Sequence, residues 1–192
     1  MVAFRTRHSL PADLSGIRES ARLDCLYRLG ILEAGADPSI DNLVACTANF
    51  FRVPMALATL ITRDKQVYKS RHGIVGEGTD RSASICQYTI RQRGVFCVSD
   101  TWRHPVLKNY AAVRDYPHIR FYAGSPIMIH GEHAIGSLCI MDREAHAVAP
   151  GQLDWLKHFA SILSHIIEIN YIGEDEQLVR TLLPAPNRAA LT

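Results

Sequence analysis

The 192-residue sequence lacks the short motifs that mark the common enzyme classes. It contains no GxSxG, HExxH, P-loop or GxGxxG pattern, so spacing alone identifies no serine nucleophile, protease zinc site or phosphate cradle. The few cysteines form neither a CxxC pair nor a zinc-binding spacing, and they stand at Cys25, Cys46, Cys86, Cys97 and Cys139. We therefore predict free thiols in a reducing cytoplasm, with no metal and no cofactor.

Long apolar runs and an excess of charge of one sign are also absent. No segment approaches the roughly 20 apolar residues that span a bilayer, and the first residues do not resemble a secretory signal. The net charge of +2, with 21% charged residues, provides no basic patch for nucleic acid or an anionic membrane surface. The 47% hydrophobic content is typical of one soluble domain with a sizeable core.

Two helices are predicted near the N-terminus, after a loose arm over residues 1–16. Apolar residues recur at helical spacing from Ile17 to Leu32. Pro38 is favourable in the first turn of a helix, and a second helix with one apolar face is expected to run to Phe51. The domain as a whole is expected to cover residues 17–171, followed by a tail over residues 172–192.

A change of period at Pro54 begins a series of strands. Met55–Thr62 is a nearly continuous apolar run and Gln66–Arg71 alternates, so the two segments predict a hairpin. A short helix is expected over Ser84–Arg91, between loops at residues 72–80 and 99–117. The segment Val95–Val98 predicts a further short strand.

The stretch from Pro117 to Asp142 predicts the last two strands. They are joined by a polar turn at residues 130–133, where Gly131 tolerates a positive φ. The order of elements does not repeat strand, helix and strand. It therefore predicts an α+β fold, with an antiparallel sheet and helices on its faces.

Two apolar stripes run along the last predicted helix, Pro150–Tyr171. One stripe can pack on the sheet, and it consists of Leu153, Leu156, Ala160, Leu163 and Ile167. The other needs a second partner, and it consists of Trp155, Phe159, Ile162, Ile166 and Ile169. That partner is either the N-terminal helix of the same chain or a second copy, as in a homodimer through the helices Ile17–Leu32 and Pro150–Tyr171.

Three residues are candidates for chemistry. Cys86 lies at the start of the short helix, where the helix dipole would lower the pKa of a thiol, although a buried Cys can also act as a small apolar side chain. Arg120 stands in a strand where valine or isoleucine would be expected, and its planar guanidinium can bind a carboxylate or a phosphate. The alternative is an internal ion pair with Asp100 that holds the long loop.

Six segments carry a resemblance to a known family. They are RLDCLYRLGIL (Arg22–Leu32), VYKSRHG (Val67–Gly73), SICQYTI (Ser84–Ile90), VSD (Val98–Asp100), HIRFYAGSPI (His118–Ile127) and IGSLCIMD (Ile135–Asp142). Their order and spacing resemble a GAF domain of the type found in bacterial sensor histidine kinases and GGDEF diguanylate cyclases. The resemblance covers Ile17 to Ile169. It implies a six-stranded antiparallel sheet with the N- and C-terminal helices on one face and a loop-covered pocket on the other.

By this resemblance, seven side chains would border a ligand pocket. They are Tyr68 and Lys69 of the second strand, Cys86 and Tyr88 of the short helix, Asp100 after the next strand, and Arg120 and Tyr122 of the arginine strand. The subgroup usually reads FCAHAI in the short helix, so Tyr88 replaces a common histidine. Gln87 follows Cys86 where bilin-binding relatives commonly have histidine, which argues against a bilin chromophore.

The resemblance implies a stand-alone, non-catalytic sensory module in the cytoplasm. It would bind an unidentified small molecule and signal through its helices to a separate partner protein. One alternative is a free methionine-R-sulfoxide reductase that uses Cys86, although no thiol stands near Gly76 or within Ala111–Asp115, where that family's other cysteines would align. Another alternative is an interaction module with a vestigial pocket.

Overall fold

An antiparallel sheet forms the centre of the computed structural model, which describes residues 15–172. Its six strands lie in the order β3-β2-β1-β6-β5-β4, and their bounds are β1 Met55–Ile61, β2 Lys65–His72, β3 Gly78–Asp80, β4 Phe96–Val98, β5 Phe121–Ile129 and β6 His133–Asp142. The predicted α+β fold is confirmed. The predicted arm over residues 1–16 and tail over residues 172–192 lie almost wholly outside the described residues.

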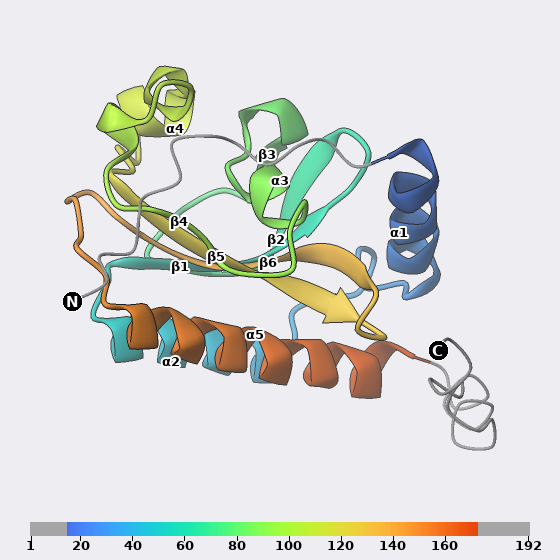
Figure 1. Cartoon of the computed structure of the whole chain (residues 1–192). Helices are drawn as coiled ribbons and strands as arrows, with labels where there is room; N and C mark the ends of the chain where they lie inside the picture. Colours follow the sequence, from blue (N-terminus) through green and yellow to red (C-terminus); the bar gives the residue numbers. More distant parts are fainter. Residues whose placement is uncertain (1–14, 173–192) are drawn as a thin grey trace, which may run out of the picture.

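The two faces of the sheet carry different layers. Helices α2 (Pro38–Phe51) and α5 (Pro150–Tyr171) lie side by side under one face (Figure 1). Loops and two single-turn helices, α3 (Cys86–Thr89) and α4 (Ala111–Arg114), cover the other face. No helix within residues 15–172 is long and apolar enough to cross a membrane.

The central strand β1 is buried along its whole length because both layers pack on it. Alternate side chains of a strand point to opposite faces. Accordingly, Ala58 and Leu60 join the core under α2 and α5, while Leu57 and Ile61 join the core under the loops. The continuous apolar run of the sequence is thus explained by burial on two sides.

Helix α1 (Gly16–Arg28) ends earlier than the predicted Leu32, since Gly30 adopts a φ of +63° that stops the helix. It lies at one end of the sheet rather than over the α2 and α5 face (Figure 1). The buried side chain of Arg22 fixes it there by donating to the Ile61 carbonyl over 2.6 Å, and Glu19 of the same helix pairs with this guanidinium over 2.7 Å.

Two short elements differ from the prediction. The segment expected to be a loop over residues 72–80 contains β3, whose three residues are all exposed and pair with β2. The helix expected over Ser84–Arg91 is only the single turn of α3. The predicted hairpin turn is present, with positive φ at both His130 and Gly131.

One apolar stripe of α5 is buried against the sheet as predicted. The other is partly covered by α2, because the ring of Phe159 lies 5.3 Å from that of Phe50. Trp155, Ile162 and Ile169 remain 53%, 48% and 72% exposed. Helix α2, and not the N-terminal α1, is therefore the intramolecular neighbour of this stripe.

Asp37 joins the start of α2 to the end of α5. Its carboxylate accepts hydrogen bonds from the backbone amides of Ser39 (2.9 Å) and Ile40 (3.3 Å), which makes it the N-cap of α2. The other oxygen accepts from the Asn170 amide (3.0 Å) and the Tyr171 hydroxyl (3.1 Å). Burial raises the pKa of this carboxyl, but these hydrogen bonds outweigh burial and hold the pKa below its usual value.

We predict that Asp37→Ala lowers the free energy of unfolding by about 2 kcal/mol at neutral pH, because it removes a cap and the tie to α5. A folded-state pKa below the unfolded one gives stability that is complete above the unfolded pKa and is lost as the pH falls through the folded pKa. In urea titrations the difference from wild type should therefore shrink below about pH 4. Asp41→Ala, in the same first turn but exposed, is the control, and an equal loss there would contradict the assignment.

Candidate functional site

A cavity of about 240 Å³ lies between the sheet and the loops on the face away from α2 and α5. Its apolar wall includes Leu57, Ile74, Ile85, Ile119 and Met141. Its polar atoms come from Gln66, Tyr68, Thr79, Ser84, Cys86, Tyr116 and Tyr122. No charged side chain within residues 15–172 lines this cavity.

Three of the seven expected site residues line the cavity. Tyr68 reaches it from β2, Cys86 from the first position of α3, and Tyr122 from β5. Burial raises the pKa of Tyr68 to about 12, so this phenol stays protonated and can donate a hydrogen bond at neutral pH. The structure thus brings together residues that are far apart in the sequence.

Lys69 lies on the opposite face of the sheet from this cavity. It follows Tyr68 in β2, and neighbouring residues of a strand point to opposite faces. Its ammonium group donates to the carbonyls of Ile31 (3.1 Å), Ala34 (3.0 Å) and Gly35 (2.8 Å) and thereby holds the turn between α1 and α2. The expectation that Lys69 borders the pocket is therefore corrected.

Tyr88 packs into the wall behind the cavity. Its hydroxyl shares a hydrogen bond of 2.5 Å with the Tyr110 hydroxyl, and its ring centroid lies 6.1 Å from that of Phe96. The residue therefore connects α3 to the long loop rather than lining the space enclosed by them.

Arg120 and Asp100 form the ion pair that the sequence left as an alternative. Arg120 immediately precedes β5, and its Nε and Nη2 donate to the two carboxylate oxygens of Asp100 over 2.9 Å each. The guanidinium also lies 4.6 Å from the ring centre of Trp102. The hydrogen bond from Arg120 lowers the pKa of Asp100. Both side chains are outside the cavity lining and hold the start of the long loop.

Cys139 lies beside Cys86, which no pattern in the sequence indicated. The two sulfur atoms are 3.6 Å apart, and the Gln66 amide donates to Cys86 over 3.6 Å. Both thiols are buried, and Cys139 comes from the middle of β6. Only long-range strand pairing and the position of α3 bring the two residues together, so no local motif marks them.

Hydroxyl groups surround this pair of thiols. The Tyr122 hydroxyl hydrogen-bonds with Thr89 Oγ1 (2.7 Å) and with Ser137 Oγ (3.5 Å). Gly124 leaves room for them, since a Cβ atom there would lie 2.4 Å from the Tyr122 hydroxyl. A glycine in the interior of β5 is thus required by the buried polar cluster.

The hydroxyl and thiol cluster lowers the pKa of Cys86. Burial raises the pKa of the thiol, but hydrogen bonds from Cys139 and the surrounding hydroxyls outweigh burial and lower it. The pKa of Cys139 is raised because its proton is held in the bond to Cys86. The predicted direction for Cys86 therefore agrees with the structure, and the hydrogen bonds of the cluster are a cause that the sequence did not show.

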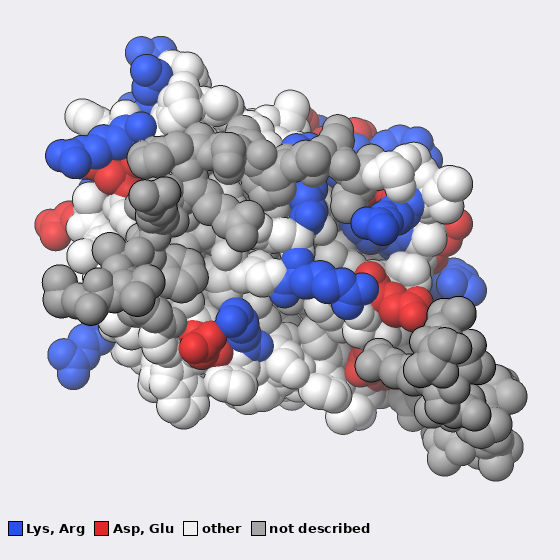
Figure 2. All heavy atoms as spheres, viewed as in Figure 1, with Lys and Arg blue, Asp and Glu red and all other residues white. Residues whose placement is uncertain are grey.

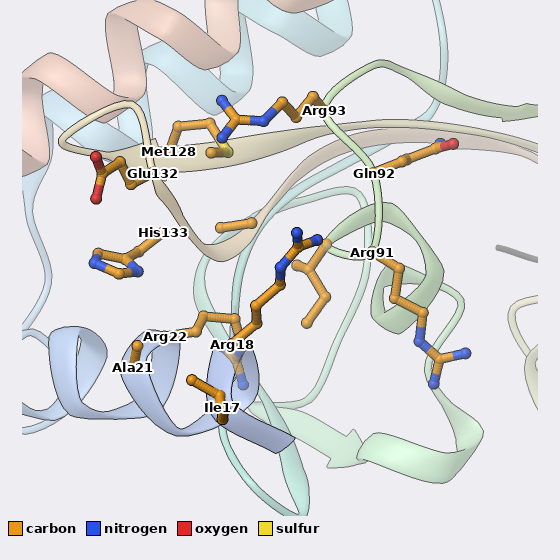
Figure 3. Close-up of a pocket in the computed structure, with 12 residues that line it drawn as sticks. Ile17, Arg18, Ala21, Arg22, Arg91, Gln92, Arg93, Met128, Glu132 and His133 are labelled. Carbon is orange, nitrogen blue, oxygen red and sulfur yellow. The ribbon is translucent and has the colours of Figure 1, made fainter. Parts of the chain in front are cut away.

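A second hollow of about 430 Å³ lies between α1, the segment after α3 and the β5–β6 turn (Figure 3). Arginines border it, but the guanidinium groups of Arg91 and Arg93 point away from each other (Figure 3). Arg91 lies over the Tyr88 ring at 4.9 Å, and Arg93 donates to the Gly131 carbonyl over 3.0 Å. Arg91 and Arg93 do not converge on one anion, and Arg22 is engaged by Glu19 and the Ile61 carbonyl, so we place the candidate site in the cavity under the loops.

We predict a coupling free energy of about 1–2 kcal/mol between Arg120 and Asp100 in a double-mutant cycle. The pair is bidentate and largely shielded from water, so both Arg120→Ala and Asp100→Ala should reduce the free energy of unfolding measured in urea. Arg103→Ala is the matched control, because Arg103 is 85% exposed and 3.5 Å from the same carboxylate. An equal coupling free energy for Arg103 and Asp100 would show that the charge of Asp100 determines the coupling, and that the bidentate geometry of the Arg120 pair does not.

Comparison with known proteins agrees with this architecture. Residues 25–167 match the family model of the GAF domain. A cyclic di-GMP phosphodiesterase of Pseudomonas aeruginosa is 33% identical over 169 residues, which cover 85% of this chain and 29% of that protein. The chain therefore spans less than a third of the length of this relative.

Two solved structures share the fold at low identity. The GAF domain of PixJ from Thermosynechococcus elongatus, in its blue-light absorbing form, has a TM-score of 0.57 and 13% identity, over 88% of this chain and 97% of that one. A free methionine-R-sulfoxide reductase from Neisseria meningitidis, in complex with its substrate, has a TM-score of 0.57 and 18% identity, over 84% and 96%. With a family match over most of the described residues and the sheet and layers seen here, the chain belongs to the GAF domain family.

Proposed function

We propose that this chain is a sensory GAF module that binds a small uncharged molecule in the cavity under the loops. The observation that carries the proposal is the Ser84 hydroxyl. Ser84 lines the cavity and is 2% exposed, and its buried hydroxyl oxygen has no hydrogen-bond partner within residues 15–172. A buried hydroxyl without a partner costs free energy, which a ligand with a hydrogen-bonding group would offset.

The lining supports an uncharged, partly apolar ligand. A carboxylate or phosphate would lose its hydration there without meeting a cation, because the cavity lining described above carries only neutral polar groups. The Gln66 amide and the Tyr68 hydroxyl add polar contacts on an otherwise apolar wall. We therefore propose a compact ring compound with an amide, hydroxyl or similar group rather than a nucleotide.

Strand β5 offers a physical route from the cavity to the helices. Tyr122, near the start of this strand, lines the cavity. The far end of the strand is hydrogen-bonded to α5 on the other face of the sheet. There the backbone amide of Met128 donates to Ser164 Oγ (2.9 Å), and that of His130 donates to Glu168 (2.7 Å). A ligand that favours one position of β5 would shift α5 by the difference in its affinity for the two states.

The proposed output is a partner protein or a neighbouring domain in a signalling pathway. The Pseudomonas aeruginosa relative is a cyclic di-GMP phosphodiesterase more than three times as long as the matched segment. We propose that this chain regulates an activity of that kind and is not itself the catalytic part.

The exposed stripe of α5 supports self-association. Trp155, Ile162 and Ile169 form, with Phe50 of α2, an apolar strip along the outer side of the two helices. In the space-filling view the lower edge, over α2 and α5, is mostly uncharged (Figure 2). We propose a homodimer through α5 and α2 and not through α1, which lies at the end of the sheet.

The reductase alternative has one observation in its favour, the Cys86 thiol in the cavity wall. Cys97 was the nearest spare thiol in the sequence, but it belongs to the core under α2 and α5, on the other face from Cys86. Burial also raises its pKa to about 12. We therefore favour sensing. Formation of methionine from free methionine-R-sulfoxide and a thiol reductant would reverse this choice.

The ligand proposal is tested by a fragment screen in which each uncharged compound is paired with its acid, such as benzamide with benzoate. We expect thermal-shift hits among the uncharged members only, and a loss of affinity of about tenfold in Tyr68→Ala. Lys69→Ala changes the neighbouring residue on the other face and should leave affinity unchanged. Hits among the acids would contradict an uncharged ligand, and a screen without hits would favour the interaction module with a vestigial pocket.

The dimer is tested by light scattering after gel filtration. Ile162→Glu combined with Ile169→Glu should yield a monomer, because four carboxylates would be buried in the symmetric interface. Ser161→Glu adds a charge to the same helix outside the apolar stripe and should leave the dimer intact. A wild-type monomer at high concentration would refute the interface.

A further inference from the structure

We propose that Cys86 in the cavity wall and Cys139 behind it are a redox pair, which a small peroxide converts into a disulfide. This inference does not rest on the identity of the ligand or on the dimer. It would give the module a second input, the presence of an oxidant of the size of hydrogen peroxide.

The two thiols are close enough to react with each other. Their sulfur atoms lie 3.6 Å apart, in contact, and a disulfide requires about 2.05 Å. Cys86 occupies the first turn of α3, a single turn between two loop segments, so a small shift of this turn can close the distance. Cys139 lies in β6 and is held by pairing with β1 and β5 on either side.

The two thiols differ in access, which assigns them different roles. Cys86 lines the cavity, whereas Cys139 is fully buried behind it. A peroxide entering the cavity therefore meets Cys86 first. The Gln66 amide points its N–H at the Cys86 sulfur and would stabilise a thiolate there. Cys139 is then the thiol that resolves the oxidised Cys86.

The cysteines outside the pair provide internal comparisons. Cys97 belongs to the core on the other face of the sheet, and burial raises its pKa to about 12, so it should stay reduced. Cys46 is exposed on α2 and should react with any thiol reagent. A reagent's size therefore separates the sites: a bulky thiol reagent reaches Cys46, and a peroxide reaches Cys86 as well.

The reaction balances with hydrogen peroxide as the only oxidant. The Cys86 thiolate attacks one peroxide oxygen, the O–O bond breaks, and the leaving hydroxide takes up a proton to become water. The sulfenic acid formed on Cys86 is then attacked by the Cys139 sulfur, which gives up its proton as the S–O bond breaks and a second water leaves. Two thiols are oxidised by two electrons, and one peroxide is reduced to two waters.

The disulfide would fasten α3 to the centre of the sheet. Because α3 carries Cys86 in the cavity wall, this cross-link would fix that part of the wall and the hydroxyl cluster around Tyr122. Oxidation and occupancy of the cavity would then influence each other through the same turn of helix.

The test uses the full chain with Cys46→Ser, which removes the exposed thiol. The reduced protein is treated with hydrogen peroxide, the remaining thiols are alkylated after denaturation, and unreduced peptides are examined by mass spectrometry. We expect a linked peptide pair containing Cys86 and Cys139 that is two hydrogens lighter and is separated by dithiothreitol. Cys97 should remain alkylated.

Two variants in this background assign the roles. Cys139→Ser should leave a sulfenic acid on Cys86 that dimedone labels, and Cys86→Ser should leave Cys139 reduced. Cys97→Ser is the matched control and should still form the linked pair. If Cys139→Ser fails to fold, the linked peptide in the parent decides.

The proposal is overturned if Cys86 stays reduced in the folded protein at peroxide concentrations that oxidise Cys46 in wild type. It is equally overturned if Cys86 proceeds to a sulfinic acid without linking to Cys139, or if it links to another cysteine.

Discussion

Burial of the central strands on both faces is the constraint from which the rest of the structure follows. Strand β1 is buried at every position, so both faces of the sheet must be covered. Two long helices cover one face with regular apolar stripes. Loops and single turns cover the other face, and their irregular backbones cannot fill it as closely. The cavity therefore lies on the loop side, between two layers that are fixed by the same strands.

Two ion pairs on the loop side hold the covering loops in place. Arg120 pairs with Asp100 at the beginning of the long loop, and Arg81 pairs with Glu19 to join the segment before α3 to α1. Both pairs lie outside the cavity lining. An arginine beside a strand is expensive to bury, and here its carboxylate partner supplies the compensation. This is why a conspicuous cationic residue coexists with a candidate site that has neutral walls.

Much of the fold could be predicted because it depends on local periodicity. The apolar run at Met55, the breaker at Pro54 and the stripes of Pro150–Tyr171 predicted β1 and α5 closely. Strand β3 escaped prediction because Gly78–Asp80 has no buried residue and forms only by pairing with β2. Of the site, Lys69 could have been excluded from the sequence, since strand alternation places it opposite Tyr68. Cys139 could not have been found, because its nearness to Cys86 depends on where α3 is folded over the sheet.

The buried hydroxyl and thiol groups beneath α3 hold the structure next to the cavity in one arrangement. Apolar side chains at these positions would pack against each other in many similar ways, whereas hydrogen bonds among Tyr122, Thr89 and Ser137 fix one arrangement. The space that Gly124 leaves open is needed for this arrangement. Because Tyr122 belongs to β5, whose other end is bonded to α5, any event that disturbs the cluster acts directly on the strand that reaches the helices. The effect of a bound ligand or of an oxidant on this cluster would therefore pass through β5 to α5, on the outside of the module.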